Sequence, residues 1–321
     1  MPSTRKTKRN HRRNSLQLFL GIDGGGTKTH AVLLDYKGEV AGEGFSGASN
    51  PLRVGIETSV ANIFHAAESA CDAANRILDD VVAVQCGLAG VRREDLRRTI
   101  RQRISENFRI KAVEVLTDAE IALYGVTLGK AGLVIIAGTG SICLGKGDNG
   151  KTAMAGGWGP LAGDEGGGAG IARRALQAIA KASDGRGDST KLSKYASEYF
   201  RTSTPDDLIV AIYSPKTDNA KIAGFAQFVV ETAQEGDEIA IDILKEAGME
   251  LGLAASAVIK KLQLNRKKIP IGCVGSIFKA GDIFTNSILE TVHQTAPKAF
   301  LTEPKFYPAH AAARMAFEKF R

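Results

Sequence analysis

The sequence has few cysteines and no long apolar run, and both absences narrow the class of protein. Its four cysteines, Cys71, Cys86, Cys143 and Cys273, lie far apart and form no CxxC pair, so we expect neither a disulfide framework nor a zinc knuckle. No apolar run reaches the roughly 18 to 20 residues that span a bilayer, and the basic N-terminus lacks the apolar segment of a signal peptide. These absences predict a cytoplasmic globular protein with no membrane partner.

Acidic residues are missing from the first 14 positions, whereas lysine and arginine there account for +6 of the net charge of +7. The same segment lacks apolar periodicity, so we expect residues 1–15 to form a disordered basic tail. A weak contact with nucleic acid is the alternative to a solvated extension. The remainder of the chain is nearly neutral, and no specific nucleic-acid partner is predicted.

Glycine is concentrated in "LGIDGGGTKT", Leu20 to Thr29. Three consecutive glycines can adopt positive φ and bring backbone N–H groups close to a ligand, which favours an anion-binding turn. A tight β-hairpin explains the same stretch, because the strand-like runs "SLQLFLGI" and "HAVLLD" flank it. The stretch alone does not decide between the two.

The order of elements repeats along the chain. From residue 16 the patterns predict three strands, then helix, strand, helix, strand and helix, and at Lys130 three strand-like runs begin again with "GTGS" in place of "GGGT". The second half is longer by a helical stretch, 164–262, and ends with a strand, a helix from about Ala280, a short strand near Lys305 and a final helix. With 44% apolar content in 321 residues, we predict two α/β domains, 16–129 and 130–321, with a helical insertion in the second.

Three motifs, in their order and spacing along the chain, resemble those of a known ATPase superfamily, and two more resemble one family within it. "GIDGGGTKT", "IIAGTGSI" and "IGCVGSIFKAG" resemble the phosphate-1, phosphate-2 and adenosine motifs of actin, sugar kinases and Hsp70. Within it, "TDAEIAL" and "GGWGPLAGDEGGGAGIA" resemble the N-acetylglucosamine kinase family, grouped with the BadF/BadG/BcrA/BcrD-type ATPases. The likeness covers Leu16 to Phe317.

The resemblance implies a duplicated actin-like (ribonuclease H-like) ATPase fold, with two domains flanking a nucleotide and sugar cleft. It implies ATP and Mg²⁺ as cofactors and a small amino sugar as substrate, and it allows a homodimer. Asp23 matches the acidic residue that steers Mg²⁺, usually through water, with structural capping as its competing role. The residues that match nucleotide contacts are Gly24, Gly25, Gly26, Thr27 and Lys28 in the first hairpin, Gly138, Thr139, Gly140 and Ser141 in the second, and Ala223, Gly275 and Ser276 around the adenosine.

Asp118 follows the apolar run "AVEVL" and opens a helix. Its position alone favours an N-cap or a partner of the helix dipole. By the resemblance it matches the catalytic base, which accepts the proton of the sugar hydroxyl that attacks the γ-phosphate. One carboxylate can serve in both ways.

The single tryptophan, Trp158, is followed six positions later by Asp164. A flat indole and a carboxylate suit a sugar, which has an apolar face and a ring of hydroxyls. A core tryptophan and an N-cap aspartate are the alternative. By the family match, the sugar site consists of Asn50, Thr139, Gly157, Trp158, Gly159 and Asp164.

The predicted function is transfer of a phosphoryl group from ATP to the 6-hydroxyl of N-acetylglucosamine. Ala89 stands where the vertebrate enzymes have a serine that contacts the acetamido region, so glucosamine and N-acetylmuramic acid stay open as substrates. Two alternatives come from other classes: an ATPase that activates a dehydratase or reductase through an iron–sulfur cluster, and a sugar-sensing protein without catalysis. Cysteines within strands disfavour the first, and the intact Asp118 disfavours the second.

Overall fold

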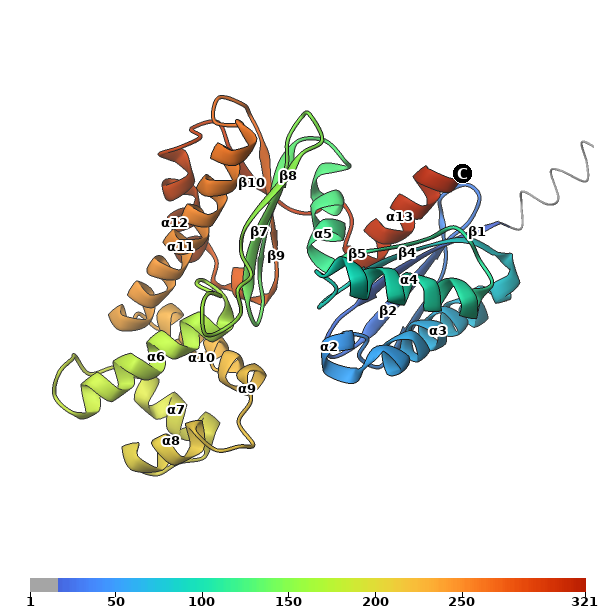
Figure 1. Ribbon diagram of the computed structural model, residues 1–321. Helices are drawn as coiled ribbons and strands as arrows, with labels where there is room; N and C mark the ends of the chain where they lie inside the picture. Colours follow the sequence, from blue (N-terminus) through green and yellow to red (C-terminus); the bar gives the residue numbers. More distant parts are fainter. Residues whose placement is uncertain (1–16) are drawn as a thin grey trace, which may run out of the picture. The chain divides into compact units, whose positions relative to one another are not determined.

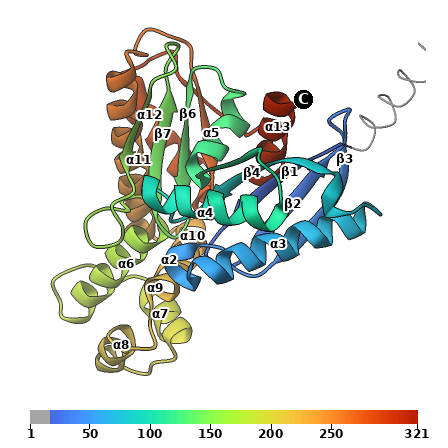
Figure 2. The same cartoon turned by 45° about the vertical axis from the view of Figure 1, so that its right-hand side comes forward.

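The computed structural model describes residues 17–321, so the predicted basic tail, 1–15, lies outside the described residues. The chain divides into two compact units. The first joins the segment that ends at Gly125 to the last 17 residues, Lys305–Arg321, and the second is Val126–Pro304. Figures 1 and 2 show the elements of each unit.

The first unit is built on a five-stranded sheet of order β3-β2-β1-β4-β5. Strands β1, β4 and β5 run parallel, and β2 and β3 join them as an antiparallel meander. The carboxyl ends of the three parallel strands therefore share one edge of the sheet. The strands are β1 (Leu18–Gly24), β2 (Thr29–Leu34), β3 (Val40–Ser46), β4 (Val81–Leu88) and β5 (Val113–Thr117).

Helices cover both faces of this sheet. Apolar residues of α3 and α4 pack with Leu20 and Ile22 of β1 on one face, and α13 packs with Phe19 and Val32 on the other. Helix α13 approaches so closely that a Cβ on Gly21 would lie 2.0 Å from the backbone nitrogen of Ala313. The helices are α2 (Pro51–Val54), α3 (Ile56–Ala73), η1 (Leu78–Asp80), α4 (Glu94–Phe108), α5 (Asp118–Thr127) and α13 (Pro308–Phe320).

The position of α13 corrects the predicted division of the chain. The sequence pattern places residues 130–321 in one domain, but α13 belongs by its packing to the first unit. Its alanine-rich face fits the close approach at Gly21. The first predicted boundary, after residue 129, lies within four residues of the observed one.

The second unit repeats the sheet of the first. Its order, β10-β9-β6-β7-β8, is the order of the first sheet read from the other end, and β6, β9 and β10 are parallel, with β7 and β8 antiparallel. The predicted repeat is therefore confirmed, although the short strand expected near Lys305 lies slightly earlier. The strands are β6 (Gly132–Ala137), β7 (Ser141–Lys146), β8 (Thr152–Gly156), β9 (Pro270–Val274) and β10 (Phe300–Thr302).

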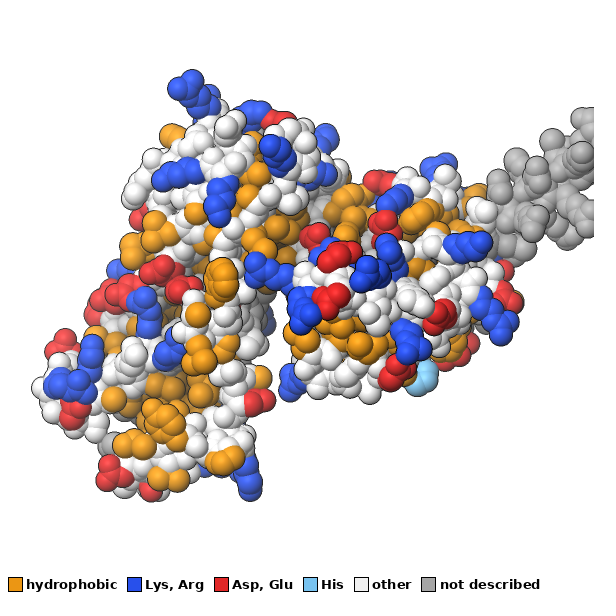
Figure 3. Space-filling view, in the orientation of Figure 1, with side chains coloured by type: hydrophobic (Ala, Val, Ile, Leu, Met, Phe, Trp, Pro, Cys, Tyr) orange, Lys and Arg blue, Asp and Glu red, His pale blue; other side chains and the backbone are white. Residues whose placement is uncertain are grey.

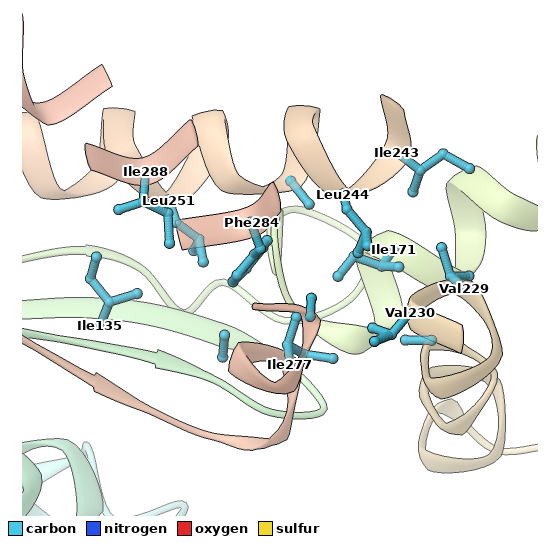
Figure 4. Close-up of a cluster of buried hydrophobic side chains, with 14 of the residues drawn as sticks. Ile135, Ile171, Val229, Val230, Ile243, Leu244, Leu251, Ile277, Phe284 and Ile288 are labelled. Atoms are coloured by element: carbon cyan, nitrogen blue, oxygen red, sulfur yellow. The ribbon is translucent and has the colours of Figure 1, made fainter. Parts of the chain in front are cut away.

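The helices of the second unit enclose a large apolar core, drawn in Figure 4. Ile135 of β6 and Phe284 of α12 are fully buried in it, together with Ile171 of α6. This core fixes the helical insertion onto the repeated sheet. The helices are α6 (Gly168–Ser183), α7 (Leu192–Phe200), α8 (Pro205–Ile212), α9 (Asn219–Gly224), α10 (Ala226–Gln234), α11 (Glu238–Leu262), η2 (Ser276–Ala280) and α12 (Asp282–His293).

The surface of the first unit mixes charges of both signs. On the face drawn in Figure 3, Lys and Arg lie among Asp and Glu rather than in a patch of one sign. Across residues 17–321, no helix has both the length and the apolar character that a membrane crossing requires.

Candidate functional site

Two aspartates meet at the carboxyl edge of the first sheet. Asp23 of β1 pairs with Gly87 of β4, and Gly87 pairs in turn with Leu116 of β5. Asp118 begins the helix directly after β5. The strand register therefore brings Asp23 and Asp118, predicted separately from the sequence, to the same edge of one unit.

The environment of Asp23 is suited to a cation. Burial raises the pKa of this carboxyl from its ordinary value of 3.8 to about 6; the negative charge of Asp118 adds to the shift and Lys28 opposes it. No group of three or more His, Cys, Asp or Glu residues in the described part of the chain could hold a metal. Mg²⁺ does not need such a group, because it binds through one or two carboxylates and keeps several waters or phosphate oxygens. The two aspartates fit this mode.

Asp118 is not the cap of its helix. Thr117 Oγ1 accepts a hydrogen bond from the backbone N–H of Glu120 at 3.2 Å, and the Glu120 carboxylate accepts one from the Thr117 N–H at 2.8 Å. This reciprocal pair is a capping box. Asp118 is an exposed residue whose carboxylate accepts the adjacent N–H, from Ala119 at 2.9 Å, while neighbouring atoms reduce the hydration of the carboxylate and raise its pKa. The position of Asp118 in the sequence therefore favoured a capping role that the structure gives to Thr117 and Glu120.

The first glycine turn is both a hairpin and an open surface of polar groups. It joins the antiparallel strands β1 and β2 and is closed by a hydrogen bond from Gly25 N–H to the Lys28 carbonyl oxygen at 3.0 Å. Thr27 and Lys28 at its tip are exposed, whereas Gly24 is buried, where a Cβ would lie 2.1 Å from Ser49 Oγ. The predicted contact of this turn with phosphate remains a prediction.

Asn50 lies beside this turn. Its backbone N–H donates to the Gly25 carbonyl oxygen at 3.0 Å, and its side-chain Oδ1 caps α2 by accepting the N–H of Leu52 at 3.0 Å. The loop after β4 meets the same place, since the Ala89 N–H donates to the Gly24 carbonyl oxygen at 2.9 Å and a Cβ on Gly90 would lie 2.4 Å from Asn50 Oδ1. The structure thus brings Asn50 and Ala89 to one edge.

The second glycine turn is tied down by the helix that follows it. Gly168 and Ala169, at the start of α6, donate N–H bonds to the carbonyl oxygens of Gly138 at 2.8 Å and Thr139 at 2.9 Å. Gly167 packs so closely that its Cβ would lie 2.5 Å from the backbone carbon of Gly140. Thr139 itself stays exposed.

Asp164 is hydrogen-bonded to the second turn. This residue is 7% exposed, and its carboxylate accepts the backbone N–H of Ser141 at 3.1 Å. A Cβ on Gly140 would lie 2.6 Å from the same carboxylate, and burial raises its pKa. The N-cap of α6 is Gly167, so the capping alternative for Asp164 is wrong, and its role as a sugar ligand remains a prediction.

Trp158 is not a core residue. Its side chain is 70% exposed, and the flanking Gly157 and Gly159 have φ values of 72° and 81°. Only glycine adopts such φ values without strain, so the three residues form a turn that presents the indole at the surface of the second unit. Its predicted contact with a sugar remains untested by this geometry.

A pocket of about 420 Å³ in the second unit gathers four of the predicted nucleotide residues. Gly138, Thr139, Ala223 and Ser276 all line it. Gly275, next to Ser276, has a φ of 123°, and its Cβ would lie 2.1 Å from the Ala137 carbonyl oxygen, so it is required for the close packing of β9 against β6. The pocket also has an apolar wall that includes the buried Val230 and Ile277, labelled in Figure 4.

Two features of the site were missed at the level of sequence. The capping box was readable as "TDAE", which has the S/T-x-x-E pattern. The polar side of the pocket, Gln227, Glu231 and Gln234, follows i, i+4, i+7 spacing on α10, although an exposed helical face shows the same pattern. Only the fold separates the two cases.

The comparisons with known proteins agree with this geometry. A solved structure from Chromobacterium violaceum superposes with a TM-score of 0.75 at 24% identity, over 94% of this chain and 99% of that one, which confirms the duplicated two-domain fold. Residues 20–316 match the model of the BadF/BadG/BcrA/BcrD ATPase family. The chain belongs to this family.

Two relatives are similar over nearly their whole length. The N-acetyl-D-glucosamine kinase of Dictyostelium discoideum is 33% identical, over 94% of this chain and 98% of its own. The N-acetylmuramic acid/N-acetylglucosamine kinase of Clostridium acetobutylicum is 31% identical, over the same shares. The family is one of ATPases, so ATP is the nucleotide expected for the pocket.

Proposed function

We propose that this chain is an ATP- and Mg²⁺-dependent kinase that phosphorylates the 6-hydroxyl of an amino sugar, most directly N-acetylglucosamine. The observation that carries the proposal is Asp118, an exposed residue whose helix is capped by Thr117 and Glu120 instead. A carboxylate that no structural role requires, at the edge that also holds Asp23, suits a general base.

The chemistry assigned to the first unit is proton transfer and charge compensation. Asp118 accepts the proton of the sugar hydroxyl as its oxygen attacks the terminal phosphorus, and the bond to the leaving ADP oxygen breaks. Asp23 would hold Mg²⁺ through water, and the metal would neutralise charge at the phosphate oxygens. The backbone N–H groups around Gly24–Lys28 orient those oxygens.

The second unit is assigned the adenosine and part of the sugar. The pocket lined by Thr139, Ala223 and Ser276 offers an apolar wall for a base, and Trp158 offers a stacking surface for a sugar ring. Use of ATP supports a cytoplasmic location. A homodimer, which the resemblance allows, is tested by light scattering on the purified full chain.

The sugar is proposed from the relatives, which are named as kinases of N-acetylglucosamine and N-acetylmuramic acid. Ala89 lies beside Asn50 and lacks the hydroxyl that could contact an acetamido group, so glucosamine stays a second candidate. An ATP-coupled assay across N-acetylglucosamine, glucosamine, N-acetylmuramic acid and glucose ranks them by kcat/KM. The product's phosphorylated position is read by NMR. No turnover above the Asp118→Asn background with any of these sugars would reject the kinase.

The activator of a dehydratase or reductase is disfavoured by where the cysteines lie. Cys71, Cys86 and Cys143 are buried, and Cys273 is half-buried within β9. A cluster held between two subunits needs thiolates that reach the surface. Reconstitution with iron and sulfide, followed by absorption spectroscopy, tests this alternative, and a bound cluster would revive it.

A further inference from the structure

Arg53 is held beside the first glycine turn by the backbone. The N–H groups of Ser49 and Asn50 both donate to the Gly25 carbonyl oxygen at 3.0 Å, and the Arg53 N–H donates to the Asn50 carbonyl oxygen at 3.0 Å. Helix α2, which carries Arg53, is therefore tied directly to the turn. The sequence motifs give no role to this arginine.

The guanidinium itself lies against the turn. A Cβ built on Gly26 would come within 3.3 Å of Arg53 Nη1 and 3.6 Å of its Cδ. Gly26 does not have a positive φ, so its backbone does not demand glycine. The absent side chain instead leaves space between the turn and the guanidinium.

The charge of Arg53 is uncompensated. Within residues 17–321, its guanidinium makes no ion pair or hydrogen bond, and its side chain is exposed. Glu57, in the first turn of α3, pairs with Arg103 at 3.5 Å instead. A guanidinium without a carboxylate partner, against a turn whose tip carries the exposed Lys28, makes this turn suited to an anion.

We propose that Arg53 binds the terminal phosphoryl group of the nucleotide at the Gly24–Lys28 turn and stabilises it during transfer. The inference rests on the proposed function for the identity of the ligand. The planar fork of a guanidinium donates two parallel hydrogen bonds to phosphate oxygens. The terminal group is favoured over the inner phosphates because the turn starts directly after Asp23, at the edge that also holds Asp118.

The test compares Arg53→Met, Arg53→Lys and a control, Arg101→Met, which removes the same charge from an exposed position in the middle of α4. Calorimetry measures binding of ADP, adenosine and the ATP analogue with an imido bridge to the terminal phosphate. For Arg53→Met we expect about 10- to 100-fold weaker binding of the analogue, the range of a lost charge-assisted hydrogen bond. Adenosine binding should not change, and ADP binding should fall by less than about 3-fold. Arg53→Lys should recover part of the loss.

Several results would overturn the proposal. Equal losses for the analogue and ADP would place the contact on the inner phosphates, and a loss no larger than that of Arg101→Met would reduce it to a general charge effect. A loss confined to turnover of N-acetylmuramic acid, with normal nucleotide binding, would assign Arg53 to the sugar's carboxylate. Because the binding arm needs no turnover, a wild type that phosphorylates none of the sugars rejects the proposed function without deciding on Arg53.

Discussion

The two glycine turns occupy equivalent positions in a repeated sheet, yet their polar groups are used differently. Around the first turn, Lys28 and Arg53 are exposed and Asp23 lies in a partly desolvated place. Around the second, the carbonyl oxygens of Gly138 and Thr139 are bonded to the start of α6, and Asp164 is bonded to Ser141. The charged side chains around the first turn are therefore free to contact a ligand, whereas the polar groups around the second turn are hydrogen-bonded within the protein.

This difference predicts which property a substitution in each unit will change. A rigid turn beside an apolar pocket is suited to binding, because a preorganised surface loses little entropy when the ligand arrives. Carboxylates kept in a desolvated place reduce stability and are retained for chemistry. Substitutions in the first unit should therefore affect turnover, and those around the second turn should affect binding or folding.

The largest expected effect in the first unit is that of Asp118→Asn. The asparagine keeps the shape and can still bond the sugar hydroxyl, but it cannot take the proton, so kcat should fall by about 10² to 10⁴-fold. Sugar affinity should change little. Stopped-flow turnover and sugar titration measure the two separately.

A matched variant separates catalysis from capping at the same helix end. Thr117→Val removes the hydroxyl that accepts the Glu120 N–H and should lower stability by about 1 kcal/mol, with a smaller effect on kcat. Asp118→Asn should not lower the melting temperature, because it removes no bond of the capping box and relieves the desolvation that raises the pKa of Asp118. A folded Asp118→Asn protein that turns over at the wild-type rate would contradict the assignment and most of the mechanism.

The next effect is a gain of stability from Asp23→Asn. The pKa of Asp23 is raised to about 6 in the folded protein, so the folded state binds this proton more tightly than the unfolded chain. Below about pH 4 the carboxyl is neutral in both states, and above about pH 6 the folded state carries the cost of the buried charge. In metal-free buffer the variant should gain up to about 3 kcal/mol over wild type as pH rises from 4 to 7, while its turnover is lost.

Chemical denaturation at pH 4, 5, 6 and 7 measures the gain, with the surface variant Asp79→Asn as the control. A stability difference that does not change with pH would mean that Asp23 is not desolvated in the folded protein. A gain that grows as pH falls would have the wrong sign for a buried carboxyl.

The sequence predicted the repeat and the glycine turns because both are local patterns. Alternating apolar residues and the "GGGT" and "GTGS" stretches specify strands and turns without knowledge of partners. The bond between Asp164 and Ser141 joins residues 23 positions apart, and the packing of α13 on β1 joins the two ends of the chain. Such pairings depend on three-dimensional placement, which is why the sequence did not reveal the bond between Asp164 and Ser141 and placed α13 in the other domain.

In the second unit, Trp158→Ala should weaken sugar binding without affecting the fold. Because the indole is 70% exposed, its removal should leave the melting temperature nearly unchanged, whereas loss of a stacking surface should raise the KM for the sugar by up to about 10-fold. Nucleotide binding should stay the same. Leu161→Ala, on the same loop and fully exposed, is the control, and equal losses for sugar and nucleotide would show that the loop serves the whole site.

The smallest expected effect is that of deleting residues 1–14, which lie outside the described residues. The first described strand begins at Leu18, and this residue is buried, with only 1% of its surface exposed. The core should therefore not need the preceding residues. The deletion removes +6 of the net charge of +7. A charge of this size can attract anionic ATP over about 10 Å in low salt, and higher salt screens the attraction. We therefore expect kcat to be unchanged at every ionic strength, and kcat/KM for ATP to fall by less than about 2-fold, only in low salt. Turnover measured from low to about 0.15 M salt checks this. A large loss that persists in high salt would show that the segment contacts one of the two units, and the comparison between the units would then have to include it.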